Sequence, residues 1–175
     1  MDWNFIIGQT ISAVVLIVSV IVTTCFKNVN YILIGEVIMN LLVALSFVFL
    51  GGWSGAWICI VATIQTVILF FCNKRQVSQK TRNILMVIFL AAYVIGTAVV
   101  YKGWADIVSC LCAFLYVLAV ISTDSSKYRW FMILNSFFWV IYDISIAAWV
   151  AIITHGITLI SCVIGKLRLD VKKSK

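Results

Sequence analysis

The sequence predicts an all-α membrane protein with seven transmembrane helices, arranged as two parallel three-helix bundles joined by a linker helix. Three observations lead to this fold class. Of the 175 residues, 64% are hydrophobic and 11% are charged, and the mean hydropathy is +1.14, which leaves too little charge for the surface of a soluble domain. The apolar residues form runs as long as a membrane is thick. The basic residues are concentrated in alternate breaks between those runs.

Five spans follow directly from apolar runs that end at polar or glycine breaks. A helix needs about 20 apolar residues to cross the hydrocarbon core. The second run stops at Gly51-Gly52, a strong local breaker, and a polar stretch at 73–83 separates the third run from the fourth. The predicted spans are 5–26, 31–50, 53–72, 84–101 and 104–121.

The last apolar block, 130–165, is too long for one membrane-spanning helix. It would be about 54 Å long against a hydrocarbon core of about 30 Å. The block must therefore turn near its middle, and Ala147-Ala148-Trp149 is the best place for the turn. This division predicts the sixth and seventh spans at 130–148 and 150–168.

The loop charges orient these seven spans. With the N-terminus outside, the inner segments 27–30, 73–83, 122–129 and 166–175 hold 1, 4, 2 and 5 of the 13 basic residues, and only Lys102 lies outside. Such an excess marks cytoplasmic loops, so we expect the basic C-terminal tail in the cytoplasm. The net charge of +7 therefore does not indicate nucleic-acid binding. Asp2 stands where a secretory signal would be positive, so we expect the first span to be retained.

The chain also contains a candidate internal repeat. Asn40 precedes Trp53 by 13 residues, and Asn135 precedes Trp149 by 14, each pair lying between a basic inner loop and a basic end. A second copy of a three-helix unit in the same orientation needs one connecting helix, and parallel repeats of this kind are a known transporter plan. The predicted organisation is a first repeat at 1–75, an inner loop and linker helix at 76–103, and a second repeat with the tail at 104–175.

Several short motifs carry a resemblance to a known family. They are Gly8-Gln9, Leu50-Gly-Gly-Trp-Ser-Gly-Ala56, Lys127-Tyr-Arg-Trp130, Trp139-Val-Ile-Tyr-Asp143 and Ser161-Cys-Val-Ile-Gly165-Lys-Leu-Arg168. With them the chain resembles the YgjV family of bacterial inner-membrane proteins, which is similar to the SWEET sugar facilitators and the PnuC vitamin-precursor transporters. The resemblance implies the same plan of two bundles and a linker helix, and a place in the bacterial inner membrane. It implies no particular substrate, and the chain has no proline, unlike SWEET-type bundles.

Polar residues at membrane depth are the candidate site, because they are costly there unless they have a function. On the span 130–148, four of them fall at i, i+4, i+7 and i+8 and so share one face. We predict that the asparagines supply hydrogen bonds, that the aromatic residues stack on a flat or sugar-like substrate, and that the aspartate pairs with the histidine. The predicted substrate-binding residues are Asn40, Gln65, Asn135, Trp139, Tyr142, Asp143 and His155.

Simpler roles compete with this interpretation. Amide and hydroxyl side chains also join membrane helices by hydrogen bonds, and aromatic residues pack the core of any bundle. Gln9, Asp106, Trp53, Trp104 and Trp149 are more typical of the membrane interface. The six cysteines form no C-x-x-C pair, which favours small packed residues over a metal or redox role.

The sequence therefore favours a small-molecule transporter or facilitator that works by alternating access between the two bundles. The substrate class would be a sugar, a nucleoside or a vitamin precursor. We expect no cofactor, no metal and no enzymatic activity, because one histidine cannot build a metal cluster and no catalytic motif is present. The expected partners are membrane lipids, the substrate and a second copy of the chain. The alternative is a non-transporting scaffold or accessory subunit, and a membrane enzyme is a third, weaker hypothesis.

Overall fold

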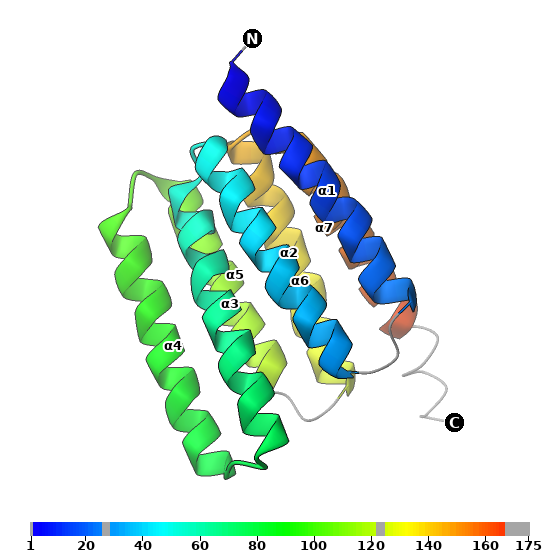
Figure 1. Ribbon diagram of the computed structural model, residues 1–175. Helices are drawn as coiled ribbons and strands as arrows, with labels where there is room; N and C mark the ends of the chain where they lie inside the picture. Colours follow the sequence, from blue (N-terminus) through cyan, green and yellow to red (C-terminus); the bar gives the residue numbers. More distant parts are fainter. Residues whose placement is uncertain (1, 26–28, 122–124, 167–175) are drawn as a thin grey trace.

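A computed structural model describes residues 2–25, 29–121 and 125–166, and within them the chain forms seven α-helices and no strand (Figure 1). All of the predicted helices are present. Their bounds are α1 (Trp3–Cys25), α2 (Val29–Phe49), α3 (Trp53–Lys74), α4 (Gln79–Val99), α5 (Trp104–Ile121), α6 (Ser125–Ser145) and α7 (Trp149–Gly165).

Two helices begin five residues earlier than hydropathy predicts. α4 starts at Gln79 instead of 84, and α6 starts at Ser125 instead of 130. At the start of α4, the Thr81 N–H donates to the Ser78 hydroxyl at 3.3 Å, which caps the helix within the polar stretch. Hydropathy locates the part of a helix at lipid depth, whereas backbone hydrogen bonding continues into the polar flank.

The turn that chain length requires in the last apolar block lies at Ala147. This residue has φ 55°, although it is not glycine. The Ala148 N–H donates to the Asp143 carbonyl at 2.9 Å, and the Ala147 N–H donates to the Ile144 carbonyl at 3.2 Å. This pair of bonds is the Schellman arrangement that closes helix C-termini. The predicted turn at 147–149 is thus confirmed.

The turn between α2 and α3 has the same construction. Gly51 has φ 79°, the Gly52 N–H donates to the Phe47 carbonyl at 2.8 Å, and the Gly51 N–H donates to the Val48 carbonyl at 3.3 Å. Gly51 therefore corresponds to Ala147, and the two turns match residue for residue.

This match corrects the predicted pairing of the two asparagines. Counting back from the turns, Asn40 corresponds to Ser136 and not to Asn135. One residue in a helix is a rotation of about 100°. Asn40 and Asn135 therefore face different directions within their helices, and the shared Asn-to-Trp spacing was misleading by that one residue.

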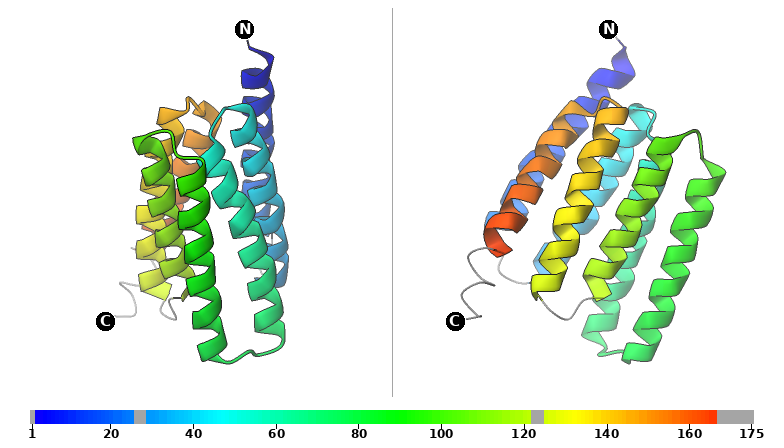
Figure 2. Two further views of the ribbon diagram at one scale, coloured as in Figure 1. Left: turned by 90° about the vertical axis from the view of Figure 1, so that its left-hand side faces the viewer. Right: turned by 180° about the vertical axis from the view of Figure 1, so that it is seen from behind.

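The helices pack as two layers with one helix at the edge (Figures 1 and 2). We call α1, α2 and α3 the first triplet, in which α2 lies between the other two helices. We call α5, α6 and α7 the second triplet, in which α6 lies between the other two. Across the layers, α1 contacts α7 and α3 contacts α5. α4 contacts only α3 and α5 among the described helices, so it closes one edge of the molecule.

The two ends of the bundle differ in chemistry. At one end, which we call the turn end, lie the turns at Gly51 and Ala147, the α4–α5 connection and the start of α1 (Figure 1). The other end, the basic end, holds the α3–α4 connection, the start of α6 and the end of α7. The described basic side chains at that end are Lys74, Arg75, Lys80, Arg82, Lys127 and Lys166.

Four tryptophans mark the turn end. Each odd-numbered helix begins with one, and their exposed fractions are 75%, 48%, 60% and 57% for Trp3, Trp53, Trp104 and Trp149. Tryptophan is enriched where a membrane meets water. The sequence predicts an interfacial role for three of them, Trp53, Trp104 and Trp149, and all four are exposed at this one end.

The molecule is apolar outside and partly polar inside. Large exposed residues along the helices include Ile64, Val87, Ile95, Phe137 and Ile160, whereas serine, threonine, glutamine, asparagine and aspartate side chains are buried. Soluble proteins have the reverse distribution. By length and composition alone, Trp53–Cys72 and Gln79–Val99 qualify as membrane-crossing helices, and the other five hold apolar stretches of 10–17 described residues.

Gly96 is expected to be essential for the packing of α4 against α3. The Trp57 indole N–H donates to the Ala92 carbonyl at 3.1 Å, and a Cβ on Gly96 would overlap the same indole. Gly96→Ala should therefore displace Trp57 and lower the unfolding free energy by about 1–3 kcal/mol. Thermal unfolding in detergent measures this. The matched control is Gly156→Ala in α7, where a Cβ meets no atom within 4 Å and stability should rise by about 0.5–1 kcal/mol.

Candidate functional site

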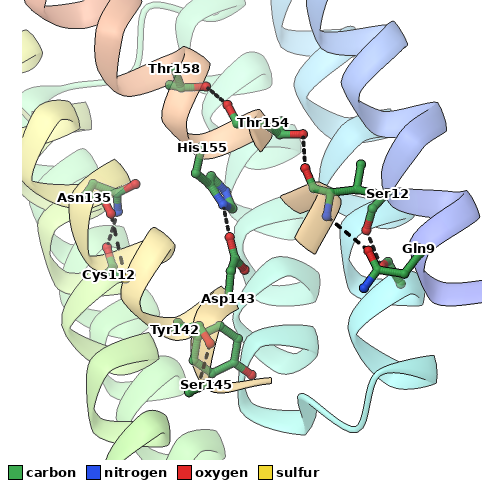
Figure 3. Close-up of polar contacts among 12 residues, drawn as sticks. Gln9, Ser12, Cys112, Asn135, Tyr142, Asp143, Ser145, Thr154, His155 and Thr158 are labelled. Atoms are coloured by element: carbon green, nitrogen blue, oxygen red, sulfur yellow. Dashed lines mark hydrogen bonds and ion pairs between the residues drawn. The ribbon is translucent and has the colours of Figure 1, made fainter. Parts of the chain in front are cut away.

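An aspartate–histidine pair lies inside the second triplet (Figure 3). Oδ2 of Asp143 on α6 is 2.6 Å from Nδ1 of His155 on α7. The Asp143 side chain is completely buried, and that of His155 is 19% exposed. Oδ1 of Asp143 has no hydrogen-bond partner within the described residues. The predicted contact between these two residues is therefore present, and half of the carboxylate remains free to accept a proton or a hydrogen bond.

Aromatic rings surround this pair. The Trp139 ring stacks on the His155 ring with centroids 5.5 Å apart and an interplanar angle of 12°. Phe47 of α2 stacks on Trp139 at 5.8 Å and meets the edge of Tyr142 at 5.5 Å. Phe47 is completely buried. It links the site to the first triplet, a role that an apolar residue in an apolar helix does not reveal in sequence.

Tyr142 connects the second triplet to the first. Its hydroxyl accepts the N–H of Gly55 at 2.9 Å and lies 3.2 Å from the Ser54 hydroxyl. A Cβ on Gly52 or Gly55 would approach this hydroxyl to 2.8 or 2.7 Å. The glycines therefore form a notch at the start of α3 that fits the tyrosine side chain.

Gln9 makes the reciprocal connection (Figure 3). From α1, its Nε2 donates to the Ala147 carbonyl at 2.7 Å, and its Oε1 accepts the Val150 N–H at 3.1 Å. Gln9 thus bridges the turn between α6 and α7, which goes beyond the interfacial role expected from sequence. We call the Tyr142 and Gln9 contacts together the clasp. Both parts lie at the turn end and both join the two triplets.

A small central cavity lies between the triplets, with a volume of about 50 Å³. Two predicted site residues, Asn40 and Trp139, line it. Asn40 is half-buried, and its side-chain amide makes no hydrogen bond to any described residue, so this amide is available to a ligand. The other lining residues are Ile58, Cys59, Ala62, Tyr93, Cys112, Ala113 and Tyr116. A second space of about 20 Å³ lies beside His155 and Ser12, between α1, α2 and α7.

Two further predicted residues have structural contacts and do not line the central cavity. Nδ2 of Asn135 donates to the Cys112 carbonyl at 2.6 Å and joins α6 to α5 (Figure 3). Gln65 is completely buried and accepts the Tyr93 hydroxyl at 2.6 Å. Asn135 therefore fits the alternative of a helix–helix hydrogen bond, whereas Gln65 orients a tyrosine that does line the cavity.

The site is nearly free of charge. Asp143 and His155 form an ionisable pair in direct contact, and no group of three or more potential metal ligands occurs in the described part of the chain. The lining of the central cavity is mostly apolar and aromatic, and Asn40 adds one amide without a hydrogen-bond partner. Such a lining can stack on a neutral ligand and hydrogen-bond it through that amide.

One comparison with known proteins gives a match. A family model named Imp-YgjV, described as bacterial inner membrane protein, matches residues 6–173. Neither the curated proteins nor the solved structures include a significant match.

Proposed function

The chain belongs to the Imp-YgjV family of bacterial inner membrane proteins, and from that premise we propose that it is a small-molecule transporter. The substrate would pass between the two triplets by alternating access, in which the triplets rock about the connecting helix α4. The observation that carries the proposal is the central cavity with its unbonded Asn40 amide, which lies between the triplets and is closed at the turn end by the clasp.

We propose that all seven helices span the membrane, with the basic end in the cytoplasm. The apolar exterior supports placement of the helices in lipid. The four tryptophans at the turn end would lie at the outer interface. At the opposite end, the Lys166 ammonium lies 4.4 Å from the centre of the Trp130 ring, a pairing suited to the inner interface. The outward apolar side chains make lipid the immediate partner.

The helix contacts support a two-fold repeat along the membrane normal. Exchanging α1 with α5, α2 with α6 and α3 with α7 maps each contacting pair among these six helices onto another contacting pair. The similar turns at Gly51 and Ala147 obey the same exchange. Both observations support the plan of two bundles and a linker helix that the SWEET and PnuC resemblance implies.

The cavity volume indicates a closed state. Ligand sites usually measure about 300–1,000 Å³, so a space of about 50 Å³ holds water but not a sugar or a nucleoside. The triplets must separate to admit a substrate. Because the lining carries no charged side chain, the proposed substrate is a neutral polar molecule with a flat or hydroxylated face, as in the sugar, nucleoside and vitamin-precursor classes.

A thermal-shift screen of the purified protein against these three classes tests the proposal. A ligand that binds the cavity should raise the melting temperature, and the rise should grow with the logarithm of ligand concentration above its Kd. The shift should disappear in Asn40→Ala, which removes the free amide from the cavity. It should persist in Asn135→Ala, which removes a helix contact outside the cavity. The proposal predicts this pair of results, and equal loss in both variants would contradict the assigned site.

The alternative of a non-transporting scaffold is favoured by one observation, the small size of the cavity. A scaffold needs no separation of the triplets, and its clasp would remain closed under all conditions. Uptake of a screened ligand into proteoliposomes distinguishes the two. Flux that saturates with ligand concentration supports the transporter, and binding without flux supports the scaffold.

A further inference from the structure

We propose that Asp143 and His155 form a proton-binding site that holds one proton when the clasp is closed and releases it when the turn end opens. Transport would then be coupled to proton movement. The inference rests on the proposed transport function and adds the coupling ion to it. Its basis is the burial, isolation and position of the pair.

The pair is isolated from other charges. His155 of α7 is its direct partner, and the other titratable groups near the carboxylate are Cys59 of α3, Cys112 of α5 and Tyr142 of α6 itself. Glu36, the acid of α2, lies about three helical turns nearer the basic end than Phe47, the α2 residue that packs on Trp139 and Tyr142. From the described part of α1, Ser12 lines the small space beside His155, and the Gln9 amide bonds the Ala147 carbonyl. No described lysine or arginine contacts the pair.

This isolation fixes the number of protons in the closed state. With one shared proton, the pair is neutral overall, either as carboxylate and imidazolium or as carboxylic acid and imidazole. Loss of that proton leaves one negative charge, and a second proton adds one positive charge. An uncompensated buried charge costs several kcal/mol. The closed state therefore retains one proton.

Opening changes this balance. When the triplets separate at the turn end, water reaches Asp143 and His155 and can stabilise the separated charges. In water, a histidine loses its proton above about pH 6.5, while an aspartate is already ionised. At neutral and higher pH, opening therefore transfers one proton from the pair to water, and closing takes one up.

The position of Asp143 in the chain links the proton to the clasp. Tyr142, which fits the glycine notch, is the preceding residue. The Asp143 carbonyl accepts the N–H of Ala148 in the turn that Gln9 bridges. On the other side, His155 stacks on Trp139, which lines the central cavity. A change in the pair thus acts directly on both parts of the clasp and on the cavity wall.

The test measures closure as a function of pH in lipid nanodiscs. Spin labels at positions 53 and 149, carried on genetically encoded residues, report the separation of the triplets at the turn end by pulsed electron paramagnetic resonance. In the otherwise native chain, the closed-to-open ratio should fall above about pH 6.5, by up to tenfold per pH unit for one released proton. Asp143→Asn should abolish this dependence, because it removes the ionisable carboxyl group. His155→Gln leaves Asp143 alone to release the proton and should move the onset toward the pKa of a solvated aspartate, about 3.9.

Two controls make the result specific. Asp106→Asn alters another acid of the turn end, which accepts the Lys102 and Gly103 N–H groups, and should keep the pH dependence. Because His155 is the chain's one histidine, ¹⁵N-histidine NMR of the unmodified protein should show its ring signals changing over the pH range in which the turn end opens. This measurement applies even if a variant fails to fold.

The outcomes separate the two proposals. Opening that does not depend on pH, or that depends on it equally in Asp143→Asn, would overturn proton coupling and leave transport standing. A turn end that stays closed at every pH, with or without a ligand found in the thermal-shift screen, would overturn both.

Discussion

Replacing His155 with leucine is expected to lower the free energy of unfolding by about 3–5 kcal/mol, the range found when one partner of a buried ion pair is removed. Asp143 is completely buried and holds His155 through Oδ2 at 2.6 Å, while Oδ1 already has no described partner. The variant would leave both carboxylate oxygens unpaired. Unfolding in detergent, followed by circular dichroism, measures the loss.

The double variant Asp143→Leu with His155→Leu is the control. It removes the buried acid together with its partner, so it should be more stable than the single His155→Leu variant, as happens when buried pairs are replaced by apolar residues. His155→Gln should be less harmful than His155→Leu because the amide can still donate to Oδ2. Equal stability of the single and double leucine variants would show that the two side chains are not coupled.

Gly55→Val is expected to force the turn end open. A Cβ on Gly55 would lie 2.6 Å from Cε1 of Tyr142, 2.7 Å from its hydroxyl and 2.8 Å from Cδ2 of Phe47. Both rings are buried and have little room to move. Overpacking of this kind costs about 1–3 kcal/mol, which reduces the closed-to-open ratio by about 5- to 150-fold.

Hydrogen–deuterium exchange mass spectrometry measures this opening. The amides of residue 55 and Val150 donate across the two triplets, to Tyr142 and Gln9, and should exchange faster by a similar factor. Gly156→Val is the matched control, because a Cβ there meets no atom within 4 Å. Protection of these two amides that is unchanged in Gly55→Val would contradict the role of the clasp.

The fold was largely predictable because its strongest determinants are local. Chain length alone required a turn in 130–165, and the turn lies at Ala147. The flanking polar residues of α4 and α6 were missed, since hydropathy does not register helix that extends beyond lipid depth. The approximate depth of Asp143 and His155 was also readable, and it correctly predicted their contact.

The cross-triplet contacts were not predictable from the sequence. They depend on how each helix is rotated, and a shift of one residue turns a side chain by about 100°. That is why Asn135 was placed with Asn40 in a shared pocket, whereas it bonds the Cys112 carbonyl instead. Gln9 and Gly55 gave a weak signal at most, a polar residue near a helix start and a glycine near another. Their partners lie 138 and 87 residues away.

The most direct test of alternating access compares the two ends of the same molecule. Pulsed electron paramagnetic resonance distances are measured between labels at positions 53 and 149 at the turn end, and at positions 74 and 127 at the basic end. We predict two populations in nanodiscs, one short at the turn end and long at the basic end, the other reversed, with their ratio changed by a ligand from the screen. A single distance at each end, unchanged by ligand and pH, would contradict transport by movement of the two triplets.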